Sequence, residues 1–282
     1  SQQTRRNLAK GVRPSVKTTK VLFTITDEYR ALISNGSYIG KKGYTIPKNI
    51  VAPEDLEIIY KELYLTPSMS GPSYGTASDT SFPVYRESLK KIYVPRFYGI
   101  ERYGIPSQCE IPVSGKVIDV IFAKSLRDYQ NEIVDVYMKH VSNPICHNKH
   151  NDGNGGILEV KTGKGKTVIA LKIVSLMRQK TLIIVHKEFL ADQWKERIDE
   201  FLPGANVGRI QGTTFDVEGK DIVIGMVQTL YNREFPENAF SEFGLTIIDE
   251  VHRIGSEEFS KTLLRIVTPN MLGISATVDR KD

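Results

Sequence analysis

Two short stretches of this sequence combine residue types that could handle a phosphate chain. The first is Gly156–Thr167, in which an apolar run leads to glycines, a lysine and a threonine. Gly163 and Gly165 would let backbone N–H groups turn towards an anion, and a following helix would point its positive end at the same place. Lys166 would supply a mobile charge for β- and γ-phosphate oxygens, and Thr167 a hydroxyl for Mg²⁺.

One position departs from the strict phosphate-loop pattern. That pattern places a glycine five residues before Gly165, where this sequence has Val160. The match is therefore partial on its own, and a surface turn rich in glycine and lysine is the plain alternative. The apolar strand before the loop and the helix-like Val168–Leu171 after it favour the phosphate-binding interpretation.

The second stretch is a pair of carboxylates that follows an apolar run. Leu245–Ile248 leads directly to Asp249 and Glu250, 82 residues after Thr167. Phosphoryl transfer needs an acid that holds Mg²⁺ and a group that orients the attacking water. Asp249 suits the metal and Glu250 suits the water. Since charges at the end of a buried strand are costly without a partner, the two stretches together predict a nucleotide-hydrolysis site.

The elements that would position these residues alternate along the second half of the chain. Strands are predicted at Thr181–His186, Asp221–Val227, Leu245–Asp249 and Met271–Ala276, and helices at Leu126–His140, Thr167–Arg178, Glu188–Phe201 and Ser256–Ile266. Near-continuous apolar strands suit burial on both faces. The fold class is therefore α/β, a mostly parallel sheet flanked by helices, with ligands at the carboxyl ends of its strands.

Three regions are expected from the composition along the chain. Residues 1–20 carry six basic and no acidic side chains, so most of the net charge of +5 lies there. This tail is predicted to be disordered, as a phosphate-contacting arm or a solvated end. Residues 21–118 are predicted to form a smaller mixed α+β accessory domain, with a strand at Val21–Ile25, an amphipathic stretch at Pro53–Tyr64 and a loop at Thr66–Ser81. Residues 119–282 would form the nucleotide-binding domain.

Within the accessory region, Tyr85–Tyr103 interleaves basic residues with aromatic ones. Such a stretch could bind a nucleic-acid strand by phosphate pairing and base stacking. The alternative is a strand that packs its aromatic rings into a small core and leaves its lysines outside. The residues alone leave both interpretations open.

Composition also bears on location and on metals. Apolar runs are too short to span a bilayer, and no hydrophobic leader follows the N-terminus, so an intracellular protein with no membrane partner is expected. Cys109 and Cys146 are expected to be two lone thiols. Cys146, His147 and His150 could ligate a metal, but a structural zinc site needs four ligands and no second pair lies nearby.

The order of these motifs resembles the first RecA-like domain of a superfamily 2 helicase of the DExH type, over about residues 122–282. Motif I is similar to Val160–Thr167, and that family often has a non-glycine residue at the Val160 position. Motif II is similar to Asp249–His252. The remaining likenesses are Leu126–Gln130 to the adenine-recognition element, Ile183–Lys187 with Gln193 and Trp194 to motif Ia, Gly225–Leu230 to a strand-contacting motif, and Ser275–Thr277 to motif III.

The resemblance implies roles for individual residues. Contacts with ATP would come from Arg127, Gln130, Thr162, Gly163, Lys164, Gly165, Lys166 and Thr167. Gln130 could read adenine, since an amide can both donate and accept at one base edge. Mg²⁺ would be held by Thr167 and Asp249, and the catalytic residues would be Lys166, Asp249 and Glu250. His252, Ser275 and Thr277 would couple hydrolysis to movement, and His186, Lys187, Gln228 and Thr229 would contact nucleic acid. Trp194 is expected in the core rather than as a base platform.

Within the superfamily, the pattern resembles DNA helicases of large DNA viruses and phage and their XPB-like cellular relatives. The final Ser275–Asp282 follows their ending, except that Val278 stands where they have proline. The resemblance implies an ATP-driven motor on DNA rather than RNA. An RNA helicase and a nucleic-acid-binding module with a vestigial ATP site are the alternatives. It also implies a second RecA-like domain in cis, without which this chain would bind ATP–Mg²⁺ weakly and hydrolyse it slowly.

Overall fold

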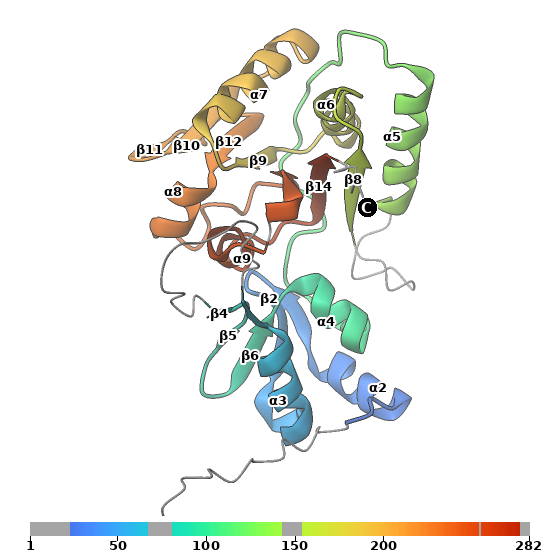
Figure 1. Ribbon diagram of the computed structural model, residues 1–282, viewed down its shortest axis with the longest axis vertical. Helices are drawn as coiled ribbons and strands as arrows, with labels where there is room; N and C mark the ends of the chain where they lie inside the picture. Colours follow the sequence, from blue (N-terminus) through green and yellow to red (C-terminus); the bar gives the residue numbers. More distant parts are fainter. Residues whose placement is uncertain (1–22, 67–80, 143–153, 254, 277–282) are drawn as a thin grey trace, which may run out of the picture.

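The computed structural model describes residues 23–66, 81–142, 154–253 and 255–276. A large sheet with its helices occupies the upper part of Figure 1, and the N-terminal elements lie below it. The predicted tail at residues 1–20, most of the loop at Thr66–Ser81, the residues Cys146, His147 and His150, and Thr277 lie outside the described residues.

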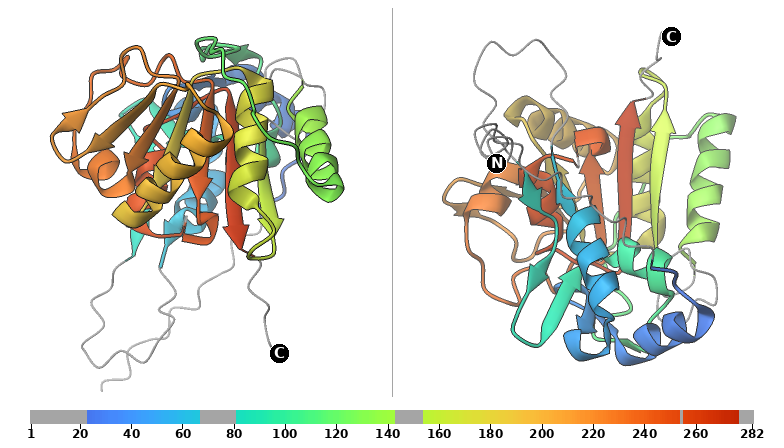
Figure 2. Two further views of the ribbon diagram at one scale, coloured as in Figure 1. Left: turned by 90° about the horizontal axis from the view of Figure 1, so that it is seen from above. Right: turned by 60° about the horizontal axis from the view of Figure 1, so that its bottom comes forward.

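The large sheet has seven strands in the order β11-β10-β12-β9-β13-β14-β8. All neighbouring pairs are parallel except the edge pair of β10 and β11. The strands are β8 (Gly155–Val160), β9 (Thr181–Val185), β10 (Val207–Gln211), β11 (Thr214–Phe215), β12 (Ile222–Met226), β13 (Leu245–Asp249) and β14 (Asn270–Ala276). Figure 2 shows β14 and β8 side by side at one end of the sheet. The predicted α/β fold class is confirmed.

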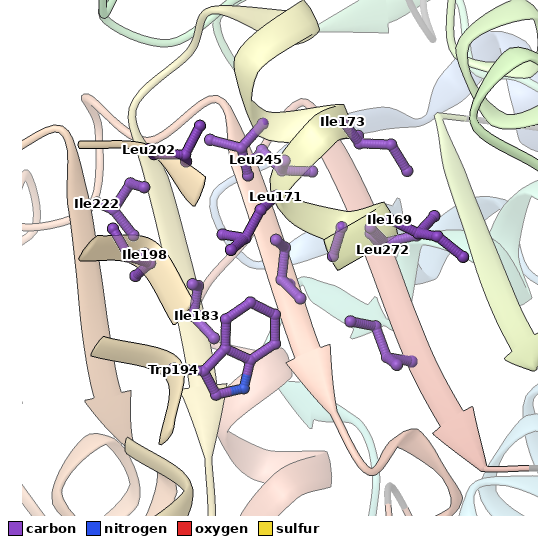
Figure 3. Packing of buried hydrophobic residues seen from close by; sticks show 14 of the residues in the cluster. Ile169, Leu171, Ile173, Ile183, Trp194, Ile198, Leu202, Ile222, Leu245 and Leu272 are labelled. Carbon is purple, nitrogen blue, oxygen red and sulfur yellow. The ribbon is translucent and has the colours of Figure 1, made fainter. Parts of the chain in front are cut away.

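Helices cover both faces of this sheet, which explains why its central strands β9 and β13 are mostly apolar. Alternate residues of β9 face opposite ways, so Ile183 and Val185 join one core cluster while Leu182 and Ile184 join another. The first cluster packs under α5 (Asp128–His140), α6 (Lys166–Met177) and α7 (Glu188–Phe201), and Figure 3 shows part of it. The second packs under α8 (Val227–Asn232) and α9 (Glu257–Leu263).

Most of the predicted elements in this half are present within a few residues of their expected ends. The strand Leu245–Asp249 and the helix Glu188–Phe201 have the predicted bounds. The sequence did not indicate β10, β11 or α8. Helix α8 begins at Val227, directly after β12 ends at Met226, so its apolar first residue was assigned to the strand.

The N-terminal unit, which comprises the described residues from 23 to 111, has a five-stranded mixed sheet in the order β5-β6-β2-β1-β7. Its elements are α2 (Asp27–Gly36), β1 (Tyr38–Gly40), β2 (Gly43–Pro47), the 3₁₀ helix η1 (Lys48–Ile50), α3 (Pro53–Glu62), β3 (Tyr64–Leu65), β4 (Phe82–Pro83), β5 (Arg86–Glu87), β6 (Lys91–Val94), α4 (Arg96–Tyr103) and β7 (Gln108–Cys109). The amphipathic stretch Pro53–Tyr64 is mainly helix α3, whereas Phe23–Ile25 forms no strand.

The basic and aromatic stretch Tyr85–Tyr103 divides into two strands and a helix. In β6, Ile92 and Val94 are buried and Tyr93 is half-buried, as strand packing predicts. Helix α4 was not expected. Its first residue, Arg96, is buried, which neither interpretation of this stretch predicted.

Arg96 joins the N-terminal unit to the large sheet. Its Nη1 donates to the carbonyl oxygens of Thr268, at 2.6 Å, and of Pro269, at 3.3 Å, just before β14. Nearby, Phe82 and Val84 pack against Leu264 in a small apolar cluster. The two sheets are therefore connected by polar and apolar contacts.

Two further expectations concern the membrane and the thiols. None of the helices in the described ranges is long and apolar enough to cross a membrane. The expectation of two free thiols is wrong for Cys109, which is disulfide-bonded. Spacing along a chain does not reveal which thiols approach each other in the fold.

Candidate nucleotide site at the ends of β8 and β13

The two predicted stretches lie at the same edge of the sheet. Strand β14 pairs with β8 on one side and with β13 on the other, and all three are parallel. Val160 at the end of β8 lies opposite Ala276, and Asp249 at the end of β13 lies opposite Ile274. The loop after β8 and the acids after β13 therefore emerge on either side of the end of β14.

The loop after β8 has the backbone of a phosphate cradle. Gly163 and Gly165 both have positive φ, 82° and 81°, a region that other residues rarely adopt. Between them the Lys164 N–H donates to the Lys161 carbonyl at 3.1 Å, which closes a tight turn. Helix α6 then begins at Lys166, so its free N–H groups and positive dipole end face the loop.

Helix α5 is hydrogen-bonded to this loop. Gln130 Nε2 and the Tyr129 hydroxyl both donate to the carbonyl oxygen of Lys164, at 3.1 and 2.9 Å. The other end of the Gln130 amide accepts from the Arg127 N–H at 3.0 Å. Gln130 is buried, and both the oxygen and the nitrogen of its amide are hydrogen-bonded to backbone atoms of the protein. Adenine contact by Gln130 and Arg127 stays a prediction.

Asp249 is anchored by two donors. Its Oδ1 accepts from the N–H of Glu250 at 2.9 Å, and its Oδ2 accepts from Trp194 Nε1 at 2.9 Å. Burial raises the pKa of the Asp249 carboxyl, and the bond from Trp194 partly opposes that rise. Trp194 lies in the core as expected. Its contact with Asp249 was missed, although a buried indole N–H usually needs an acceptor.

Glu250 contacts His252, one of the residues expected to couple hydrolysis to movement. Its backbone has φ of 58°, the left-handed region, which is uncommon for a non-glycine residue and typical of functional sites. Its Oε2 lies 3.1 Å from His252 Nδ1, and the same ring nitrogen lies 3.4 Å from the Ser275 hydroxyl. A polar path therefore runs from the end of β13 to the end of β14.

The residues expected to contact nucleic acid lie after two neighbouring strands, β9 and β12. Gln228 Nε2 donates to the His186 carbonyl at 3.0 Å, and Thr229 Oγ1 accepts from the Gly212 N–H at 2.9 Å. Burial lowers the pKa of His186, which favours the neutral ring. Lys187 is exposed. Of the four, Lys187 is the one that is open to solvent, while Gln228 and Thr229 bond to neighbouring backbone.

The residues present fit a magnesium–nucleotide. A hydroxyl at Thr167 and a carboxylate at Asp249 are the oxygen donors that Mg²⁺ prefers. The loop between Gly163 and Lys166 offers backbone N–H groups and a lysine for the phosphates. Thr162 and Lys164 are exposed in this loop.

The chain is similar to several known proteins. A family model described as type III restriction enzyme, res subunit, matches residues 123–280. The chain is 32% identical over 252 residues to the putative ATP-dependent RNA helicase L396 of Acanthamoeba polyphaga mimivirus, covering 86% of this chain and 46% of that protein. It is 37% identical over 181 residues to the DNA 3'-5' translocase XPB2 of Sulfurisphaera tokodaii, covering 61% of this chain and 37% of that protein.

The chain thus spans less than half the length of these curated relatives. Among solved structures, the UvsW helicase from bacteriophage T4 aligns over 81% of this chain and 88% of that one, with 16% identity and a TM-score of 0.48.

Proposed function

This chain belongs to the superfamily 2 helicases, in the family described as type III restriction enzyme, res subunit, and from that premise we propose that it binds and hydrolyses ATP to drive movement along DNA. The observation that carries the proposal is the junction at the end of β14. On one side lies the phosphate loop, and on the other lies Asp249–Glu250, which reaches Ser275 of β14 through His252.

The proposed roles follow from the position of each residue. The backbone between Gly163 and Lys166 cradles the phosphates, and the Lys166 ammonium neutralises their charge. Thr167 and Asp249 hold Mg²⁺, which when bound draws charge from the phosphate oxygens. Glu250 orients the attacking water, as a carboxylate at this position can accept its proton.

Coupling to movement is proposed to pass through His252. Its Nδ1 is within reach of both Glu250 and Ser275. When the charge near Glu250 changes, the His252 ring can favour one partner over the other, and Ser275 would carry that change to β14. Thr277 is proposed to take part on the strength of the motif resemblance alone.

DNA is proposed as the nucleic-acid partner, with RNA as the second candidate. DNA is favoured by the similarity to a protein named a DNA translocase, and RNA by the similarity to one named an RNA helicase. Lys187, together with His186, Gln228 and Thr229, is proposed to line the contact.

The N-terminal unit is proposed to be a separate accessory domain that also contacts nucleic acid, with the boundary near residue 119. An intracellular location, where ATP and Mg²⁺ are available, completes the proposal.

We further propose that a second RecA-like domain acts in cis in the whole protein. By the resemblance to superfamily 2 enzymes, that domain would supply arginine side chains to the ATP site. Such arginines can raise the rate of phosphoryl transfer by about 10³–10⁵-fold. Hydrolysis by this chain alone is then expected to be very slow. Robust DNA-stimulated ATPase activity from residues 1–282 would contradict this part of the proposal.

The site assignment is tested by Lys166→Ala. In the full-length protein it should abolish ATP hydrolysis, and in this chain it should weaken binding of a fluorescent ATP analogue. Lys195→Ala is the matched control, because Lys195 is an exposed residue of α7 paired with Asp199. A Lys166→Ala protein that keeps full ATPase activity would refute the site. If the wild-type full-length protein bound ATP but did not hydrolyse it in the presence of any nucleic acid, that result would favour a nucleic-acid-binding module with a vestigial ATP site.

The nucleic-acid partner is tested in the full-length protein with DNA and RNA of the same sequence. We expect ATP hydrolysis to rise more with DNA than with RNA at equal nucleotide concentration. A larger rise with RNA would overturn the DNA assignment while leaving the ATP site untouched.

A further inference from the structure

Trp194 is the only tryptophan in this sequence, and it lies beside the proposed magnesium ligand. The indole is buried, with 2% of its surface exposed, in the core cluster between α7 and the sheet. Figure 3 shows it at the opposite end of this cluster from Leu245, the first residue of β13. At that end its Nε1 donates to Asp249 Oδ2 at 2.9 Å.

We propose that Trp194 is a positioning residue that fixes the Asp249 carboxylate in the orientation that holds Mg²⁺. The inference rests on the proposed function, and it adds a residue from α7 to a site otherwise built from the ends of β8 and β13. Two bonds set the carboxylate: a local one from the Glu250 N–H to Oδ1, and one from Trp194 to Oδ2. A carboxylate has about four acceptor positions, so these two bonds leave positions for a cation.

The contact is more than the packing of a large apolar side chain. Packing at this end of the core needs only volume, which a phenylalanine would supply. The indole adds one N–H donor, and a buried donor of this kind is destabilising unless it is bonded. Here its acceptor is a charged carboxylate, and such charge-assisted bonds are stronger than neutral ones. Groups that hold a metal ligand from behind typically affect metal affinity strongly.

The test compares Trp194→Phe with the wild-type chain in nucleotide binding at varied Mg²⁺. Binding of a fluorescently labelled ADP is measured across a Mg²⁺ titration and again in EDTA. Phenylalanine keeps most of the volume and removes the N–H. We expect the Mg²⁺ concentration for half-maximal binding to rise about 10-fold, a typical loss when such a partner is removed. Binding in EDTA should be unchanged, because the phosphate loop is intact.

Ile198→Val is the matched control. Ile198 is buried in the same cluster, one turn further along α7, and has no polar group to offer Asp249. It should lower thermal stability slightly and leave the Mg²⁺ dependence unchanged. If both variants shift the Mg²⁺ dependence equally, or Trp194→Phe shifts it not at all, Trp194 is a packing residue and the inference fails.

The single tryptophan supplies an independent measurement. In the wild-type chain, the emission of Trp194 should change when ADP binds with Mg²⁺ and stay constant when ADP is added with EDTA. Constant emission during Mg²⁺-dependent binding would contradict the inference. The absence of any nucleotide binding by the wild-type chain would instead contradict the proposed function, so the two failures are distinguishable.

Discussion

At the residue scale, Asp249 shows how a functional group works against stability. Its carboxyl is largely buried behind Trp194, and burial raises its pKa above the usual value. The folded protein therefore binds this proton more tightly than the unfolded chain does. A carboxylate in that position lowers the free energy of unfolding at every pH above the unfolded pKa of about 4. The protein keeps a charge that its fold alone disfavours, as expected of a cation ligand.

The sign of that effect can be measured with Asp249→Asn. We expect this variant to have a higher free energy of unfolding than the wild type at pH 7 in the absence of Mg²⁺. The gain should shrink as the pH falls and vanish below about 4, where the carboxyl is protonated in both the folded and the unfolded state. Urea denaturation at several pH values checks this, with Glu237→Gln as an exposed control. A loss of stability at pH 7 would contradict the role of burial.

At the element scale, the contact between α5 and the phosphate loop decides how firmly the loop is held. Gln130 and Tyr129 both bond the Lys164 carbonyl, and a Cβ atom at Gly165 would lie 2.5 Å from Gln130 Nε2. The side chain could give way only by breaking bonds at both ends of its amide. At Gly163 no atom lies within 4 Å of such a Cβ. The two glycines therefore have the same backbone conformation but different surroundings.

This difference predicts unequal effects of the same substitution. Gly163→Ala should lower the free energy of unfolding by about 1 kcal/mol through its positive φ alone, and Gly165→Ala by about 2–3 kcal/mol. In a Gln130→Ala background the additional loss at Gly165 should fall to that seen at Gly163. Chemical denaturation of the wild type, the three single variants and the Gln130→Ala/Gly165→Ala double variant checks this. Equal losses at the two glycines in the wild-type background would show that α5 does not restrain the loop.

The sequence predicted features that depend on local patterns and missed contacts between elements. Strand β13 and helix α7 were predicted with correct bounds because a continuous apolar run and a regular helical period are local properties. Helix α4 was missed because its basic and aromatic residues suggested a surface. The helical period of the sequence placed Trp194 in the core, but could not show its hydrogen bond to Asp249, because the two residues lie 55 positions apart. Local patterns fix elements, whereas such contacts depend on how the elements pack.

At the scale of the whole molecule, Arg96 connects two sheets that form separately along the chain. Its Nη1 bonds two carbonyls before β14, and its guanidinium lies 4.7 Å from the Phe97 ring centre. Burial lowers the pKa of Arg96 to about 10, so the side chain remains charged at neutral pH. A movement of the N-terminal unit would therefore act directly on the strand that carries Ser275.

Arg96→Met should loosen this connection. Methionine keeps an unbranched apolar side chain but leaves the carbonyls of Thr268 and Pro269 without their donor. We expect a loss of about 1–3 kcal/mol in the free energy of unfolding and faster hydrogen exchange in peptides covering residues 264–272. Arg197→Met is the control, since Arg197 forms an exposed pair with Glu200 on α7. Unchanged exchange would mean that the apolar cluster alone holds the two sheets together.

The pairing of β8 with β14 has a consequence for the synthesis of this protein. Among the described residues, β8 pairs with β14 alone. The partner of Gly155 in this pairing is Met271, which lies more than a hundred residues later in the sequence. Such distant parallel pairings form slowly. While a ribosome makes this chain, β8 has no sheet to join until β14 emerges. The growing chain is therefore expected to leave the backbone of β8 unpaired and the Leu158 side chain, which is buried in the folded protein, exposed throughout that interval, and to depend on chaperones then more than at any later time.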